Sequence, residues 1–321
     1  MSCTTAWVFG GQGSQTYGMG AELYEKMPSF RKHMNTLSEE VADRIGVFLP
    51  ELLYSSERRR SELFKRTLHT HPAIFILQYS IGAALIEEGE KPDLLLGYSL
   101  GEFVAAALSG MLPVKEVLDC VILQAELLEN SCEPGGMTAF LGSVNHWEDL
   151  NIEGDGVWLA GVNHAKHFAV SGTLDGLKHT EKLLSAQGLT PCRLPVEFAF
   201  HSPMIEITKT PFIEAAHRLS FAKGHTDVFF SSTVSRCNTI SPDGIWHTTR
   251  NPVRFQETME TLIAEKEQVY LDFSPAGSMT NLIRYGFQNS TPPSIYKFFC
   301  PFGHDFAELQ KTKEALARIR R

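Results

Sequence analysis

The chain has 321 residues, of which 43% are hydrophobic and 21% charged, and this composition excludes a disordered, collagen-like or coiled-coil protein. At about 150 residues per domain, the length predicts two domains, or one large domain with an insert. The 29 Lys and Arg against 37 Asp and Glu residues give a net charge of −8, which disfavours general nucleic-acid binding.

The first half of the chain predicts a parallel α/β core. A short apolar strand runs into a glycine-rich loop, two helical segments divided at Pro28 and an amphipathic helix follow, and an apolar strand then leads directly into another helix. The order of strand, turn and helix is typical of parallel α/β proteins. In chain order these elements are expected at 6–9, 10–15, 20–34, 73–87, 93–97 and 100–108.

A stretch rich in turn residues begins near 130, and the elements after it predict an inserted small subdomain at 130–196. Their order is strand, helix, strand, strand, helix, strand, which is the ferredoxin-like arrangement. They are expected at 137–144, 146–150, 156–163, 167–172, 174–187 and 189–196.

The large subdomain is expected to comprise 1–129 and 197–321. Its second part should add two strands, a helix between them and a charged amphipathic helix at the end of the chain. These elements are expected at 228–232, 252–265, 269–273 and 306–321.

The six cysteines have no C-x-x-C spacing, so the sequence offers no zinc or dithiol motif, and we expect no metal. The first residues lack the basic and apolar regions of a signal peptide. No apolar run approaches the ~20 residues needed to span a bilayer. We therefore expect a cytoplasmic protein with reduced thiols and no membrane contact.

The clearest chemical motif is G-x-S-x-G at 97–101, between an expected strand and an expected helix. This context is the one that a nucleophile elbow requires, because the glycines permit a tight turn and the helix N-terminus can stabilise an oxyanion. Ser99 is therefore the candidate nucleophile.

A nucleophilic serine needs a base, and His201 is the best candidate among 12 histidines, because it ends an apolar run beside Ser202-Pro203. A buried structural histidine would give the same pattern. No acid is singled out by spacing. Asp272 could orient the base or could be a strand-end residue, and backbone carbonyls could do the orienting instead.

Several ordered motifs resemble those of malonyl-CoA:acyl carrier protein acyltransferases. The opening Phe-Gly-Gly-Gln-Gly-Ser-Gln resembles their Phe-Pro-Gly-Gln-Gly-Ser-Gln, and the elbow followed by Glu102 resembles their Gly-His-Ser-x-Gly-Glu. Phe-Ala-Phe-His at 198–201 resembles their His-Ala-Phe-His box. The motifs at 251–255 and 274–277 match further landmarks of the family.

The resemblance implies an acyltransferase fold, with an α/β-hydrolase-like large subdomain and an inserted ferredoxin-like small subdomain. It implies that Ser99 carries the acyl group as an ester and that His201 is the base. It further implies an oxyanion hole made by the backbone N–H groups of Gln12 and Leu100. The carbonyl that orients His201 is expected near Thr248, giving a Ser–His dyad without an acid.

Three departures from the family pattern bear on specificity. Gly10 replaces a Pro, and Tyr98 replaces the His beside the nucleophile. Gln124 replaces the Arg that pairs with the free carboxylate of malonyl, and no Arg lies between Arg66 and Arg193. Glutamine cannot form the guanidinium–carboxylate fork, so we expect Gln124, Tyr98, Phe198 and Phe200 to shape a pocket for uncharged acyl groups.

Tyr98 and Gln124 resemble the stand-alone acyl hydrolases of polyketide assembly lines whose modules lack built-in acyltransferases. The leading interpretation is an editing hydrolase that acts on acyl carrier proteins. The alternatives are a malonyl- or acyl-CoA:acyl carrier protein transacylase and a non-catalytic docking module. No cofactor is implied, because the phosphopantetheine arrives with the acyl thioester. Arg254 and Arg58–Arg60 are candidate carrier-protein contacts, or solvated arginines.

Overall fold

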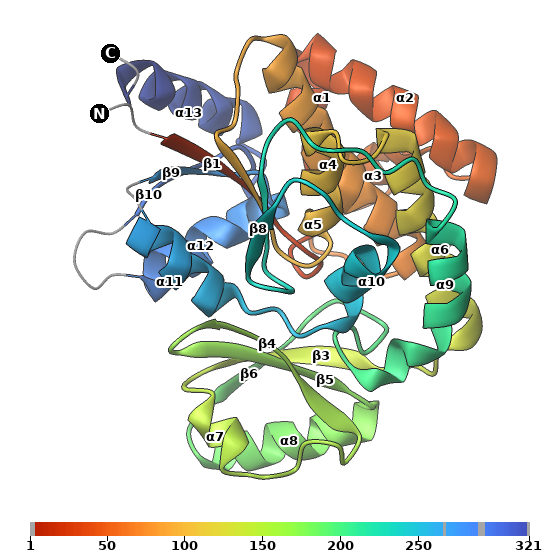
Figure 1. Ribbon diagram of the computed structural model, residues 1–321, viewed down its shortest axis with the longest axis vertical. Helices are drawn as coiled ribbons and strands as arrows, with labels where there is room; N and C mark the ends of the chain where they lie inside the picture. The colour runs from red at the N-terminus through yellow and green to blue at the C-terminus, as the bar shows by residue number, and fades with distance from the viewer. Residues whose placement is uncertain (1–3, 266–267, 288–292, 320–321) are drawn as a thin grey trace.

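The structure is a computed structural model that describes residues 4–265, 268–287 and 293–319. A larger α/β unit, shown in the upper part of Figure 1, is joined to a smaller unit built on a second sheet. The described helices and strands are β1 (Thr4–Phe9), α1 (Ala21–Lys26), α2 (Pro28–Ile45), α3 (Leu49–Tyr54), α4 (Thr67–Glu87), β2 (Leu94–Gly97), α5 (Gly101–Ser109), α6 (Val114–Ser131), β3 (Gly136–Leu141), α7 (Asn145–Glu148), β4 (Val157–His164), β5 (His167–Gly172), α8 (Leu174–Ala186), β6 (Thr190–Arg193), η1 (Pro203–Thr208), α9 (Lys209–Ala216), β7 (Val228–Phe230), β8 (Ser235–Cys237), α10 (Pro242–Arg250), α11 (Phe255–Glu265), β9 (Gln268–Asp272), η2 (Pro275–Gly277), α12 (Ser278–Gly286), β10 (Ser294–Lys297) and α13 (Asp305–Ile319).

The sheet of the large subdomain is parallel except at one edge. Among the described strands its order is β10-β9-β1-β2-β7-β8, and only the β7–β8 pair is antiparallel. Strand β1 lies inside the sheet, paired with β9 and β2. Parallel strands of this kind need apolar side chains on both faces, and Ala6 to Phe9 are all buried.

Alternate residues of the sheet belong to two separate cores because successive strand side chains point to opposite faces. Trp7 and Phe9 pack into the core that includes α2, α4, α5 and α6. Ala6 and Val8 pack on the other face, against α11 and α12. Helices therefore cover both faces, as the sequence predicts for a parallel α/β core.

The small subdomain is a four-stranded antiparallel sheet of order β4-β5-β3-β6. This is the ferredoxin-like order, and helices α7 and α8 lie together beyond one face of the sheet (Figure 1). The two chain segments that enter and leave this unit lie side by side, since the Gly135 N–H donates to the Glu197 carbonyl at 2.9 Å. The structure thus combines a parallel α/β core with a ferredoxin-like sheet, the two kinds of unit that the sequence predicts.

The boundaries of several elements differ from expectation for local reasons. The strand expected at 137–144 ends at Leu141, because Gly142 adopts φ +155°. The helix expected from 252 begins at Phe255. Asn251 is the extended C-cap that ends α10, and Pro252 follows it. Helix α6 extends to Ser131, slightly past the expected boundary at 130. Residues 320–321 of the expected C-terminal helix lie outside the described residues.

Two glycines show how closely the backbone packs in the small subdomain. Gly136 and Gly172 face each other across β3 and β5. A Cβ at Gly172 would lie 2.2 Å from the Gly156 carbonyl oxygen, whereas one at Gly136 would meet only a Leu177 methyl at 3.3 Å. We expect Gly172→Ala to destabilise the protein by about 1–3 kcal/mol or more, and Gly136→Ala by less. Urea unfolding followed by circular dichroism measures both, and equal losses would contradict this account.

Candidate active site

Ser99 lies in a strained turn between β2 and α5. Its backbone has φ +52°, in the left-handed region that non-glycine residues rarely adopt. The turn needs glycine on both sides. A Cβ at Gly101 would lie 2.1 Å from the Phe9 carbonyl oxygen, and one at Gly97 would lie 2.4 Å from the Glu102 Cα. The G-x-S-x-G motif therefore has the nucleophile-elbow geometry, with Ser99 just before the N-terminus of α5.

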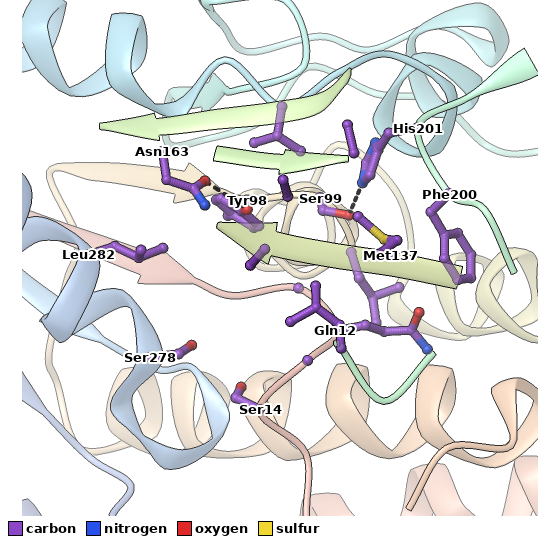
Figure 2. Close-up of a pocket in the computed structure, with 18 of the residues that line it drawn as sticks. Gln12, Ser14, Tyr98, Ser99, Met137, Asn163, Phe200, His201, Ser278 and Leu282 are labelled. Carbon is purple, nitrogen blue, oxygen red and sulfur yellow. Dashed lines mark hydrogen bonds between the residues drawn. The ribbon is translucent and has the colours of Figure 1, made fainter. Parts of the chain in front are cut away.

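His201 meets Ser99 from a distant part of the chain. The Ser99 Oγ lies 2.8 Å from the His201 Nε2, and the two side chains point toward one another in Figure 2. His201 also has a positive φ, +60°. Its backbone N–H donates to the carbonyl of Thr249 at 2.9 Å. The last turn of α10 therefore holds the strained histidine in place.

The carbonyl that orients His201 belongs to Asn251, so the expectation for Thr248 is wrong. The His201 Nδ1–H donates to the Asn251 carbonyl oxygen at 2.7 Å. Helix α10 ends at Arg250, and Asn251 is its extended C-cap, so the Asn251 carbonyl is free to turn toward the imidazole. This bond leaves Nε2 unprotonated in the neutral ring, able to accept the Ser99 proton.

Asp272, the alternative orienting acid, is a strand-end residue. Its carboxylate accepts hydrogen bonds from the backbone N–H and hydroxyl groups of Ser274 and Thr280, at 2.5–2.8 Å. These bonds hold the turn from β9 into α12. The dyad is therefore completed by a backbone carbonyl in this structure.

Burial, with a smaller effect of the nearby Arg250 charge, lowers the pKa of His201 to about 4, although the hydrogen bond to Asn251 opposes the shift. The side chain is only 3% exposed. A neutral imidazole at ordinary pH is the state that a general base requires.

The glycine-rich loop after β1 passes directly beside Ser99. A Cβ at Gly11 would lie 3.0 Å from the Ser99 Cβ. The Gly10 N–H donates to the Gln78 Oε1 at 2.7 Å, a bond that the family's usual proline could not make. A Cβ at position 10 would also lie 2.5 Å from the Ser274 Cβ, so glycine suits this position in this chain.

The two amides expected to form the oxyanion hole are free. Within the described residues, neither the Gln12 nor the Leu100 backbone N–H has a hydrogen-bond partner, and both residues line the cavity beside Ser99. The Gln12 side chain is tied away by its bond to the Thr70 hydroxyl at 2.8 Å. The assignment of these amides to an oxyanion remains a prediction that fits this arrangement.

Glu102 is a buried carboxylate that joins three segments of the site. It accepts hydrogen bonds from Ser231, from the hydroxyl and backbone N–H of Ser232, and from the Thr248 hydroxyl, at 2.7–3.0 Å. Burial raises its pKa to about 7, against the lowering effect of these donors. Thr248 thus supports the site through Glu102 and makes no contact with His201.

The cavity beside the dyad has a volume of about 380 Å³ and lies between the two subdomains. The large subdomain contributes the loop, the elbow, α4, α6 and α12. The small sheet contributes mostly apolar side chains, including Met137, which Figure 2 shows close to the dyad. Among the described residues that line it, none is Lys, Arg, Asp or Glu.

Three of the four residues expected to shape the pocket line this cavity. Tyr98, Gln124 and Phe200 do so, but Phe198 does not. Phe198 instead packs into the core of the large subdomain. Phe200 belongs to the same core and also lines the cavity. The Gln124 Nε2 donates to the Thr249 hydroxyl.

Tyr98 belongs to a hydrogen-bonded chain across the two subdomains. Its hydroxyl donates to the Asn163 Oδ1 at 2.8 Å, and the Asn163 Nδ2 lies 2.7 Å from the His167 Nδ1. Figure 2 shows Tyr98 and Asn163 facing each other beside Ser99. Burial raises the pKa of Tyr98 to about 12 and lowers that of His167 to about 4. Asn163 and His167 are site residues that no sequence motif had singled out.

Three of the four arginines considered for carrier binding already have partners for their side chains. Arg58 pairs with Glu62 and covers the Tyr17 ring. Arg60 donates to the Gly18 and Pro301 carbonyls, and Arg254 pairs with Glu257. In the described ranges no group of three or more His, Cys, Asp or Glu side chains has a metal-binding arrangement, and no helix has the length and apolar character to cross a membrane.

The fold and the Ser99–His201 pair define a nucleophile-elbow site in an α/β protein. The acyl transferase domain family matches residues 6–315, and the chain belongs to this family. The polyketide biosynthesis acyltransferase homolog BaeD of Bacillus velezensis is 31% identical over 316 residues, which cover 98% of each chain. The homolog PksD of Bacillus subtilis is 31% identical over 303 residues, covering 94% of each chain.

Solved structures share the fold. The acyltransferase domain from the second module of the salinomycin polyketide synthase has a TM-score of 0.86 at 23% identity, covering 97% of this chain and 72% of that one. A type II polyketide synthase malonyl-transacylase, solved in complex with its acyl carrier protein, has a TM-score of 0.83 at 22% identity, covering 97% and 99%.

The low pKa of His201 predicts an unusual pH dependence of acyl-enzyme formation. The base is lost only when His201 is protonated, so we expect the acidic limb of kcat/KM near pH 4, well below the ordinary histidine value of about 6.5. Burst-phase acylation between pH 4 and 8 measures it. A limb near pH 6.5 would contradict the prediction.

The control for that pH profile is a measurement of whether the protein stays folded at each pH. Because the pKa of His201 is depressed in the folded protein, its contribution to stability is present above about pH 6.5 and is lost as the pH falls toward 4. Circular dichroism at each pH therefore separates loss of the base from unfolding.

Proposed function

We propose that the protein is an acyl hydrolase that releases short uncharged acyl groups from acyl carrier proteins of a polyketide synthase, as an editing step. The observation that carries this proposal is the cavity beside the Ser99–His201 pair, whose described lining has no charged Lys, Arg, Asp or Glu side chain. Gln124 stands on its wall where malonyl-type relatives are expected to have Arg.

The first half-reaction forms an acyl-enzyme. The Ser99 Oγ attacks the thioester carbonyl carbon while the His201 Nε2 takes the hydroxyl proton. The backbone N–H groups of Gln12 and Leu100 stabilise the oxyanion of the tetrahedral intermediate. The C–S bond then breaks, and the imidazolium returns the proton to the phosphopantetheine thiolate. No separate cofactor is needed.

The second half-reaction uses water. His201 takes a proton from water, whose oxygen attacks the ester carbonyl. Collapse of the second tetrahedral intermediate breaks the bond to the Ser99 Oγ, which regains a proton from His201. The products are the free acid and the original enzyme, and the carrier protein leaves with a free thiol.

The lining of the cavity disfavours malonyl. A hydrogen bond to a charged group contributes ~1.5–3 kcal/mol, so the lack of a cation reduces selectivity for malonyl by roughly 10- to 150-fold. The cost of burying the unpaired carboxylate adds to this loss. Acetyl and butyryl groups carry no charge, so they avoid the cost of burying a carboxylate.

A transacylase is the second candidate, and the names of the relatives favour it. Both Bacillus proteins are described as acyltransferase homologs, and one structural neighbour is a transacylase held in complex with a carrier protein. Transfer shares the first half-reaction, and a second thiol then replaces water as the acceptor. An acyl carrier protein is the proposed partner in both cases.

The first test distinguishes these two activities directly. Purified protein is incubated with acetyl-, butyryl- and malonyl-loaded carrier protein, with and without an unloaded acceptor carrier, and intact-protein mass reports acyl loss and transfer. We expect acetyl and butyryl to appear as free acids without gain on the acceptor, and Ser99→Ala to abolish the reaction. Efficient malonyl transfer would overturn the proposal.

A charge-introducing variant tests the role of position 124. Gln124→Arg places a guanidinium on the cavity wall, and we expect acylation by malonyl to rise about tenfold or more relative to butyryl. Gln124→Met is the matched control, since it removes the amide without adding charge and should leave malonyl a poor substrate. An equal malonyl rate in the two variants would refute the charge argument.

A further inference from the structure

The residues that line the active-site cavity include His71 on α4, Gln124 on α6 and Phe200. The His71 and Phe200 rings lie with their centroids 5.3 Å apart. The backbone carbonyl of Val121 interacts with His71, and Gln124 follows Val121 by three residues on the same face of α6. His71 and Gln124 are therefore neighbours on this wall.

His71 brings an unused hydrogen-bond acceptor to the cavity. Its side chain is 2% exposed, and burial lowers its pKa to about 3, so the ring is neutral. A neutral imidazole has one nitrogen without a proton. Within the described residues the Nδ1 of His71 has no hydrogen-bond partner, and the bond to the Val121 carbonyl accounts for the ring N–H.

Gln124 adds a second acceptor beside it. This side chain is 3% exposed, and its Nε2 donates to the Thr249 hydroxyl. Its Oε1 receives no hydrogen bond from the described part of the chain. The cavity wall thus presents two acceptors, the buried His71 Nδ1 and the Gln124 Oε1, and, among its described lining residues, no cation.

This arrangement selects for a ligand group that donates a hydrogen bond. Buried acceptors are unfavourable when they remain unpaired. A carboxylate is acceptor-only and would be repelled, and a plain alkyl chain would leave both acceptors unsatisfied. An alcohol hydroxyl donates one proton and carries no charge, so it matches both the acceptors and the uncharged lining.

We propose that His71 and Gln124 recognise a hydroxyl on the acyl chain, so that the preferred substrate is a short hydroxyacyl thioester. This inference rests on the proposed function for the identity of the reaction, and it adds the chemical class of the acyl group. His71 and Gln124 are then specificity-determining residues that contact substrate.

The test compares acyl groups that differ only in the hydroxyl. Carrier protein is loaded with butyryl, 2-hydroxybutyryl or 3-hydroxybutyryl, and kcat/KM for acyl-enzyme formation and for acid release is measured. We expect at least one hydroxybutyryl group to be preferred over butyryl by about 10- to 100-fold, as expected for one or two neutral hydrogen bonds made in a buried site.

Three substitutions, two at His71 and one at Gln124, identify the origin of that preference. His71→Leu and Gln124→Met remove one acceptor each, and we expect each to reduce the hydroxyl preference about tenfold while butyryl is still processed. His71→Gln keeps an acceptor and should retain much of the preference. Equal reduction by His71→Gln and His71→Leu would overturn the role assigned to His71.

The outcomes for the two proposals are separable. Release of butyryl and both hydroxybutyryl groups at the same rate overturns hydroxyl recognition and leaves the hydrolase intact. Transfer of all three to an acceptor carrier, with the hydroxyl preference present in acyl-enzyme formation, overturns the hydrolase and supports hydroxyl recognition.

Discussion

The site depends on the buried carboxylate of Glu102. It lies in the first turn of α5, three residues after Ser99, and accepts hydrogen bonds from the residues that follow β7 and from Thr248 in α10. Helix α10 leads directly to Asn251, whose carbonyl orients His201. One carboxylate therefore connects the element that presents the nucleophile to the element that aligns the base, and both strained residues, Ser99 and His201, are held by this shared support.

The strain at these two residues is a form of preorganisation. Positive φ values at Ser99 and His201 are unfavourable in isolation and persist because the surroundings fix them. The close approach of Gly101 to the Phe9 carbonyl fixes the first, and the bond from the His201 N–H to the Thr249 carbonyl fixes the second. The hydrogen bond between Oγ and Nε2 is thus made before any substrate arrives, which reduces the reorganisation needed in the reaction.

The sequence predicts what is encoded locally and misses what depends on tertiary contacts. The elbow is predicted because its glycines and its strand–helix context are adjacent in the chain, and the ferredoxin-like order follows from the alternation of short elements. The carbonyl that orients His201 was misplaced by three residues, from Thr248 to Asn251, because the exact end of α10 decides which carbonyl is free. Asn163, His167 and His71 were missed because each reaches the cavity from a segment without a recognisable motif.

Gly135 and Glu197, where the chain enters and leaves the small subdomain, are hydrogen-bonded neighbours. Since the chain enters and leaves this unit at neighbouring points, the unit between them can be exchanged as a cassette without altering the path of the large subdomain. The small sheet supplies much of the apolar wall but neither member of the Ser99–His201 pair. The apolar part of the pocket can therefore diversify through the small module, while the Ser99–His201 pair, His71 and Gln124 stay in the large one.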